Sequence, residues 1–288
     1  MLDMNHVVTL LKILPQNTIS RTLGDLARLK MPAYLREPVV TAFARMLGAD
    51  VREAEKAPGQ YKSLADFFTR RLKPGVRTFP GSLTKVACPV DGLLRAIGPV
   101  ENGRLEQVKG IYYNVDSLLL DPERTSLFRN GDQVNLYLSP SDYHRVHSPL
   151  PGKITGWRYI PGGLLPVNGL TIARVPALFT LNERLTIYLQ TGLGQVAVVM
   201  IGAMVVGRIR AAFDNIVTNG SRGRILDFRE YDKPIPVEAG DELGVFELGS
   251  SVVLLFEPGR IHFEEVQAGS LVKLGQVLAR ARKKERQG

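Results

Sequence analysis

The feature that most constrains the fold of this chain is a change in its hydrophobic periodicity near residue 85. Before that point, apolar residues recur at helical spacing. After it, short apolar runs of strand length alternate with Gly and Pro residues that favour turns. The pattern predicts an α+β chain, with an N-terminal helical region (residues 1–80) and a mainly antiparallel β domain (residues 81–288).

The N-terminal region predicts short amphipathic helices. They are expected over residues 4–14, 18–30, 39–47 and 64–68. Basic amphipathic helices suit a membrane interface, although a helical subdomain packed on the core is an equally simple interpretation. The basic segment Arg70–Arg77 that follows is expected to be a solvated surface loop.

Seven apolar runs in the second region predict strands. They are Leu93–Ile97, Gln133–Leu138, Lys153–Tyr159, Leu185–Leu189, Gln195–Val206, Glu242–Glu247 and Ser251–Phe256. The basic tail Ala281–Gly288 is expected to be frayed.

The composition of the chain limits which partners and which cellular surroundings are expected. A formal net charge of +9 predicts an acidic partner, either nucleic acid or an anionic membrane surface. The single cysteine, Cys88, excludes an internal disulfide framework and is expected to be a small buried hydrophobe. We see no signal peptide and no run near the ~20 apolar residues that a membrane span needs.

One short motif could carry unusual chemistry. In Leu248-Gly249-Ser250-Ser251, a glycine directly precedes a serine at the start of an apolar run. If a base removed the Ser250 hydroxyl proton, Oγ could attack the Gly249 carbonyl and convert the amide into an ester. β-Elimination would then break the chain and leave a dehydroalanine that hydrolyses to a pyruvoyl group. On these four residues alone, a tight turn that leads into a strand is the simpler interpretation.

Three further residues are candidates for proton transfer or metal binding. His144 and His147 stand three positions apart in a segment bracketed by Pro140 and Pro149, which predicts a loop at a strand end. The two histidines could bind zinc only with a third protein ligand. Asp91, on a predicted Asp-Gly turn, could orient a histidine, although turn formation alone also explains it.

Taken together, these motifs resemble the bacterial phosphatidylserine decarboxylase proenzymes. The shared order is Pro-x-Asp-Gly at residue 89, Leu-Ser-Pro-x-Asp-Tyr-His-Arg-Val-His-x-Pro at residue 138, and Leu-Gly-Ser-Ser at residue 248. The resemblance extends to Phe67-Phe68-x-Arg, Arg77, Val167-Asn168 and the segment Leu178–Arg184. Two positions depart from the family pattern: Ser251 replaces the usual threonine, and Leu181 stands where an arginine is common.

The resemblance implies a site and a reaction. The chain would cleave itself between Gly249 and Ser250, giving a β chain (residues 1–249) and an α chain (residues 250–288) that starts with a covalent pyruvoyl cofactor. Asp91, His147 and Ser250 would form the charge relay for cleavage, and His144 would act on the substrate or in proton transfer. A Schiff base between the pyruvoyl group and the serine headgroup would then lead to decarboxylation to phosphatidylethanolamine.

The resemblance also implies the surroundings of the protein. The substrate would be phosphatidylserine at an anionic membrane surface, with no nucleic acid and no metal involved. The protein would be peripheral on the cytoplasmic side of the cell membrane, with the two chains paired and the pair dimerised. Two alternatives from the residues alone are a non-catalytic β-barrel module that binds membrane or nucleic acid, and a zinc hydrolase built on His144 and His147.

Overall fold

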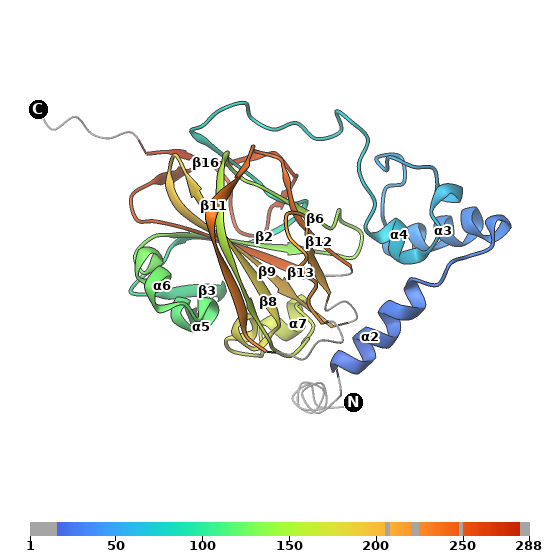
Figure 1. Cartoon of the computed structure of the whole chain (residues 1–288), viewed down its shortest axis with the longest axis horizontal. Coiled ribbons are helices and arrows are strands. Elements are labelled where there is room, and N and C mark those ends of the chain that lie inside the picture. Colours follow the sequence, from blue (N-terminus) through green and yellow to red (C-terminus); the bar gives the residue numbers. More distant parts are fainter. Residues whose placement is uncertain (1–15, 205–207, 220–224, 248–249, 283–288) are drawn as a thin grey trace, which may run out of the picture.

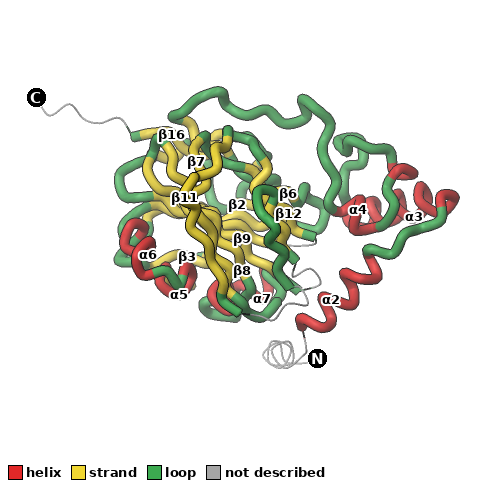
Figure 2. The backbone as a smooth tube through the Cα atoms, viewed as in Figure 1, coloured by secondary structure: helices red, strands yellow, loops and turns green. Residues whose placement is uncertain are grey.

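The computed structural model describes residues 16–204, 208–219, 225–247 and 250–282. The first predicted helix (residues 4–14), the residues Leu248 and Gly249 of the predicted cleavage motif, and most of the basic tail lie outside the described residues. The predicted α+β class is confirmed: strands form the body of the molecule, and helices lie beside it (Figures 1 and 2).

An eight-stranded antiparallel sheet organises the described part of the chain. Its strand order is β11-β7-β8-β9-β13-β5-β2-β15. The strands are β2 (Gly92–Pro99), β5 (Asp132–Leu138), β7 (Gly152–Ile160), β8 (Arg184–Thr191), β9 (Gly194–Gly202), β11 (Asp227–Val237), β13 (Ser250–Phe256) and β15 (Leu271–Val272).

A hydrophobic core covers each face of this sheet. The central strand β13 is accordingly apolar on both sides. Val252, Leu254 and Phe256 join one core cluster, whereas Val253 and Leu255 join the other. Successive side chains of a strand point to opposite faces, so an unbroken apolar run fits a central strand between two cores. All seven residues of β13 are buried.

Three smaller sheets and several short helices cover the two faces. The strands are β1 (Lys85–Ala87), β3 (Arg104–Val108), β4 (Ile111–Asn114), β6 (Arg145–His147), β10 (Ile209–Ala211), β12 (Glu242–Phe246), β14 (Ile261–Phe263) and β16 (Val277–Ala281). The sheet β10-β12-β6 contributes to the same core as Val252. The other core includes residues of α5 (Val115–Leu119), α6 (Pro122–Phe128), α7 (Gly169–Ile172) and α8 (Leu178–Leu181).

The N-terminal helices lie to one side of the β body, next to β6 and β12 (Figure 1). They are α2 (Gln16–Ala27), α3 (Ala33–Leu47), η1 (Pro58–Gln60) and α4 (Leu64–Phe68). This region has a small core of its own that includes Val40, Tyr61 and Phe67. Within the described residues, no helix is both long and apolar enough to cross a membrane.

Several local predictions were wrong, and three of them concern where an element begins or whether a strand forms. Helix α3 begins at Ala33 and includes Pro38, which was expected to precede the helix. The segment around the histidines contains the short strand β6 where a loop was expected. Strand β11 was missed because its residues are mostly polar and exposed and include two prolines, which an edge strand tolerates.

Candidate active site

Ser250 opens the central strand of the large sheet. It pairs with Leu138 of β5 on one side and with Gly202 of β9 on the other. The Ser250 side chain is fully buried, and its Oγ has no hydrogen-bond partner among the described residues. The two-residue period of the strand puts this side chain on the face of Val252, which is also the face covered by β6 and β12. A buried hydroxyl without a partner is costly, and such atoms often mark sites of chemistry.

The two candidate histidines flank the strand that covers this face. His144 directly precedes β6, and its carbonyl accepts a hydrogen bond from the Phe246 N–H at the end of β12. His147 ends β6 and pairs with Glu242 at the start of β12. His144 and His147 therefore lie about 10 Å apart along β6, at ~3.3 Å per residue.

His144 is a buried histidine with a free ring nitrogen. Its Nδ1 lies 2.9 Å from the Asp142 carbonyl oxygen. A carbonyl oxygen can only accept, so Nδ1 carries the proton and Nε2 carries a lone pair. That Nε2 has no partner among the described residues, and the ring packs against Phe68 at a centroid distance of 4.1 Å. Burial lowers the pKa of His144 to about 3, so the ring is neutral at pH 7.

His147 is a histidine with both ring nitrogens engaged. Its Nδ1 donates to the Gly240 carbonyl oxygen at 2.6 Å, so Nε2 accepts the hydroxyl proton of Tyr143 at 3.0 Å. Burial lowers the pKa of His147, and the bond to Gly240 opposes that effect only in part. The Tyr143 ring also stacks on the imidazole, with the ring planes 20° apart.

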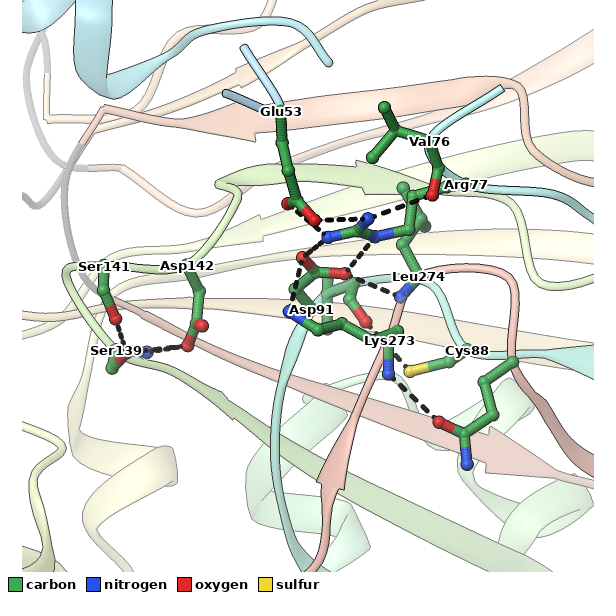
Figure 3. Close-up of polar contacts among 12 residues, drawn as sticks. Glu53, Val76, Arg77, Cys88, Asp91, Ser139, Ser141, Asp142, Lys273 and Leu274 are labelled. Carbon is green, nitrogen blue, oxygen red and sulfur yellow. Dashed lines mark hydrogen bonds and ion pairs between the residues drawn. The ribbon is translucent and has the colours of Figure 1, made fainter. Parts of the chain in front are cut away.

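Asp91 lies in a network of cations. Figure 3 shows Arg77 between Glu53 and Asp91, and the Arg77 guanidinium contacts both Asp91 oxygens, at 2.9 and 2.6 Å. The Leu274 N–H donates to Asp91 at 2.8 Å, and the Lys273 ammonium lies 3.5 Å away. Burial by itself would raise the pKa of Asp91, but the bonds from Arg77 and Leu274 outweigh it and lower that pKa below its usual range.

The structure places His147 beside the turn that carries Asp91, without a hydrogen bond between the two side chains. The His147 N–H donates to the carbonyl of Pro89, which places His147 beside the turn that carries Asp91. Among the described residues, no hydrogen bond links Asp91 to His147 or either histidine to Ser250.

Only the middle of the basic segment Arg70–Arg77 is the solvated surface that its composition predicted: Arg71 and residues 73–75 are exposed, whereas the arginines at the two ends are not. Arg70 is 4% exposed and donates to the carbonyls of Ser141 and Asp142, in the loop before His144. The Arg77 side chain is 10% exposed and pairs with Asp91. Sequence reasoning also missed the bond from Tyr143 to His147. The signal for the two arginines was their place in the family resemblance, but charge alone suggested solvent.

Metal binding has little structural support in the described part of the chain. Within it, no three His, Cys, Asp or Glu side chains gather in a group that could hold an ion. The zinc interpretation of His144 and His147 needs a third ligand that these residues do not supply. Cys88 is buried, its thiol lies 3.0 Å from the Val90 carbonyl oxygen, and burial raises its pKa to about 12.

Comparison with known proteins identifies the family. The sequence model of phosphatidylserine decarboxylase matches residues 64–280. The phosphatidylserine decarboxylase proenzyme of Anaeromyxobacter sp. (strain K) is 45% identical over 276 residues, covering 95% of this chain and 98% of the relative. The proenzyme of Myxococcus xanthus (strain DK1622) is 44% identical over 269 residues, covering 93% and 95%. That of Pseudomonas aeruginosa (strain LESB58) is 40% identical over 274 residues, covering 93% and 94%. A family match over residues 64–280 and relatives 40–45% identical over almost the whole chain show that it belongs to the phosphatidylserine decarboxylase family.

Proposed function

We propose that this chain is a proenzyme that cleaves itself between Gly249 and Ser250 and then decarboxylates phosphatidylserine to phosphatidylethanolamine. The observation that carries the proposal is Ser250 itself: a fully buried serine at the start of the central strand, with an unpartnered Oγ. Membership of the family favours this enzyme over a non-catalytic basic module.

The proposed cleavage balances within the chain plus one water. A base takes the Ser250 hydroxyl proton, Oγ bonds to the Gly249 carbonyl carbon, and the amide C–N bond breaks as the amine takes a proton. Loss of the Cα proton of residue 250 then expels the Gly249 carboxylate and leaves a dehydroalanine. Its imine tautomer takes up water and releases ammonia, which leaves a pyruvoyl group at the new N-terminus.

The site suits a pyruvoyl group at residue 250. That group supplies a carbonyl that takes the substrate amine and withdraws electrons from the carbon that loses CO₂. Burial of residue 250 excludes water from this carbonyl. His144, neutral and with a free Nε2 lone pair, can accept a proton near the substrate and return it to the carbon after CO₂ departs.

The proposed base for self-cleavage is His147, oriented by Asp91. Its backbone bond to Pro89 and its burial support a place beside Asp91. Nε2 accepts from the Tyr143 hydroxyl, so the base role requires Tyr143 either to release Nε2 or to pass the proton through its own hydroxyl. Asp91 is ionised next to Arg77, which suits a group that stabilises an imidazolium.

The two chains would remain one molecule after cleavage. The proposed α chain begins with β13, and every residue of β13 pairs with both β5 and β9 of the proposed β chain. A cut before Ser250 therefore leaves the central strand held on both edges. Further pairing of the α/β unit into a dimer is part of the proposal that comes from the family resemblance.

The N-terminal helices are the proposed contact with the membrane. Apolar side chains of α2, of α3 and of the turn after α2 are strongly exposed, among them Leu26, Leu29, Tyr34 and Met46. Together with the net charge of +9, this exposure suits docking on an anionic lipid surface as a peripheral protein, on the cytoplasmic side of the cell membrane.

The proposal is tested by CO₂ release from carboxyl-labelled phosphatidylserine in mixed micelles. We expect release by the wild-type protein and none above background for Ser250→Ala. Ser251→Ala is the matched control because Ser251 has an equally buried hydroxyl on the opposite face of the same strand, and it should retain release. Equal release by the Ser250→Ala protein would refute the proposal.

A further inference from the structure

Arg70 is a buried cation with no carboxylate in ion-pair contact within the described part of the chain, although Asp91, Asp142 and Glu53 lie close enough to favour its charge. The residue is 4% exposed, and burial lowers the pKa of its guanidinium. Its Nη2 donates to the Ser141 and Asp142 carbonyls at 2.8 and 3.2 Å, whereas Nε and Nη1 have no partner. Phe67 lies against the guanidinium, 5.0 Å from ring centroid to Cζ. A buried charge without an ion-pair partner is costly, and two unpartnered donor nitrogens suit the guanidinium to receive an anion.

The Arg70 guanidinium and the His144 imidazole belong to one cluster. Both donate to the same oxygen atom, the Asp142 carbonyl, from Arg70 Nη2 at 3.2 Å and from His144 Nδ1 at 2.9 Å. The neighbouring Phe68 packs on the His144 ring. Two unpartnered donor nitrogens of Arg70 and the unpartnered Nε2 of His144 therefore belong to buried side chains that meet at one carbonyl oxygen.

We propose that Arg70 binds the phosphodiester of the lipid headgroup and so positions the substrate beside His144. The inference rests on the proposed function. The planar fork of an arginine suits the oxygens of a phosphate or a carboxylate, and phosphatidylserine carries both. The carboxylate loses its charge as CO₂ leaves, so an arginine bound to it would stabilise the substrate more than the transition state. The phosphodiester keeps its charge throughout, which makes it the better partner for a fixed cation.

The test compares Arg70→Gln and Arg70→Lys with Arg71→Gln. Arg71 is the matched control because it is the next residue, carries the same charge and has a side chain that is 60% exposed. Each protein is first scored for self-cleavage on a denaturing gel. Cleaved proteins are then incubated with cyanoborohydride and one of three soluble amines, and the fraction of modified α chain is measured by mass spectrometry.

The three amines separate the two possible anions. Ethanolamine has neither group, serine has the carboxylate, and glycerophosphoethanolamine has the phosphodiester. We expect Arg70→Gln to cleave itself and to capture ethanolamine and serine as the wild type does. Its half-saturating concentration of glycerophosphoethanolamine should rise roughly 10- to 100-fold, as for the loss of a hydrogen bond to a charged group. Arg70→Lys should lie between, and Arg71→Gln should match the wild type.

Several results would overturn the assignment. If the half-saturating concentration rises for serine alone, Arg70 binds the carboxylate. If it does not rise, or rises equally for all three amines, Arg70 has no role in headgroup recognition. Failure of both Arg70 variants to cleave would make it a support of the His144 loop. Failure of the wild-type protein itself to cleave or to capture ethanolamine would instead count against the proposed function.

Discussion

His144 and His147 lie at the two ends of the short strand β6, and their surroundings differ in kind. His147 has a partner for each ring nitrogen, and it lies beside the turn whose Asp91 pairs with Arg77. His144 has a free Nε2, and the neighbouring Arg70 has two free donors. At the His147 end of β6, which we call the closed end, the polar atoms bind one another. At the His144 end, polar atoms are left that a substrate could bind. We therefore infer that maturation depends on the His147 end and lipid chemistry on the His144 end.

The first way to break this comparison is His144→Gln. If His144 serves the substrate, the variant should still cleave itself but release CO₂ about 10²- to 10⁴-fold more slowly, which is the usual contribution of a general acid or base. Rates are measured on the cleaved fraction, with His262→Gln, an exposed strand histidine, as the control. Uncleaved His144→Gln would assign His144 to maturation instead.

The second test of the comparison is His147→Ala, which we expect to impair self-cleavage. Self-cleavage should be blocked or slowed at least about a hundredfold, measured as the time course of the two fragments on a denaturing gel. Normal cleavage would remove His147 from the base role. Tyr143→Phe sharpens the result: unchanged or faster cleavage means that the hydroxyl only occupies Nε2, whereas loss means that it conducts the proton.

The third concerns the stability of the closed end. Arg77→Gln leaves Asp91 buried with only Lys273 and the Leu274 N–H as partners, so the free energy of unfolding should fall by about 3 kcal/mol. Urea unfolding is measured in a Ser250→Ala background, so that every sample is one uncut chain. Arg71→Gln, which breaks an exposed pair with Glu242, should cost less than about 1 kcal/mol. Similar losses in both variants would contradict a buried network.

The stabilisation from the Arg77–Asp91 pair should also depend on pH. Because the pKa of Asp91 is lowered in the folded chain, its stabilisation is present above the unfolded value of about 4 and is lost as pH falls through the folded pKa. The difference in unfolding free energy between the Arg77→Gln and parent proteins should therefore shrink below about pH 4. A difference that does not change with pH would mean that the carboxylate charge is not what Arg77 stabilises.

The fourth prediction tests the neutral state of His144. Its pKa is about 3 when folded and about 6.5 when unfolded, so unfolding takes up a proton between these values. Stability should fall with decreasing pH from about 6 to 4, with His144 contributing about 1.4 kcal/mol per pH unit. In the Ser250→Ala background, His144→Gln should remove that part of the slope. An unchanged slope would mean that His144 is accessible to protons in the folded chain.

The sequence predicted the fold best where apolar periodicity is strong. The buried run in β13 and the other six predicted strands are all present, although β9 ends at Gly202, earlier than expected. Prediction failed where a contact with distant residues decides the structure. The three residues of β6 form a strand because β12 pairs with them, and β12 lies about a hundred residues further along the chain.

The candidate site shows the same limit. Ser250 could be singled out from its motif, and its burial follows from the apolar strand that it opens. The contacts of the other site residues could not be predicted from the sequence, because charge and residue type do not show which side chains are close in space. Arg77 was expected in solvent, yet it is the main partner of Asp91, and Arg70 was expected in solvent, yet it lies in the core beside His144.

The central claim is that the bond between Gly249 and Ser250 is made to break. Its most direct test is the intact mass of the purified protein under denaturing conditions, for the wild type and for Ser250→Ala. We predict two chains from the wild type, residues 1–249 and residues 250–288, the smaller with a pyruvoyl group in place of its N-terminal serine. Ser250→Ala should give one full-length chain. A single full-length mass for active wild-type protein, or a small chain that begins with an ordinary serine, would contradict the account.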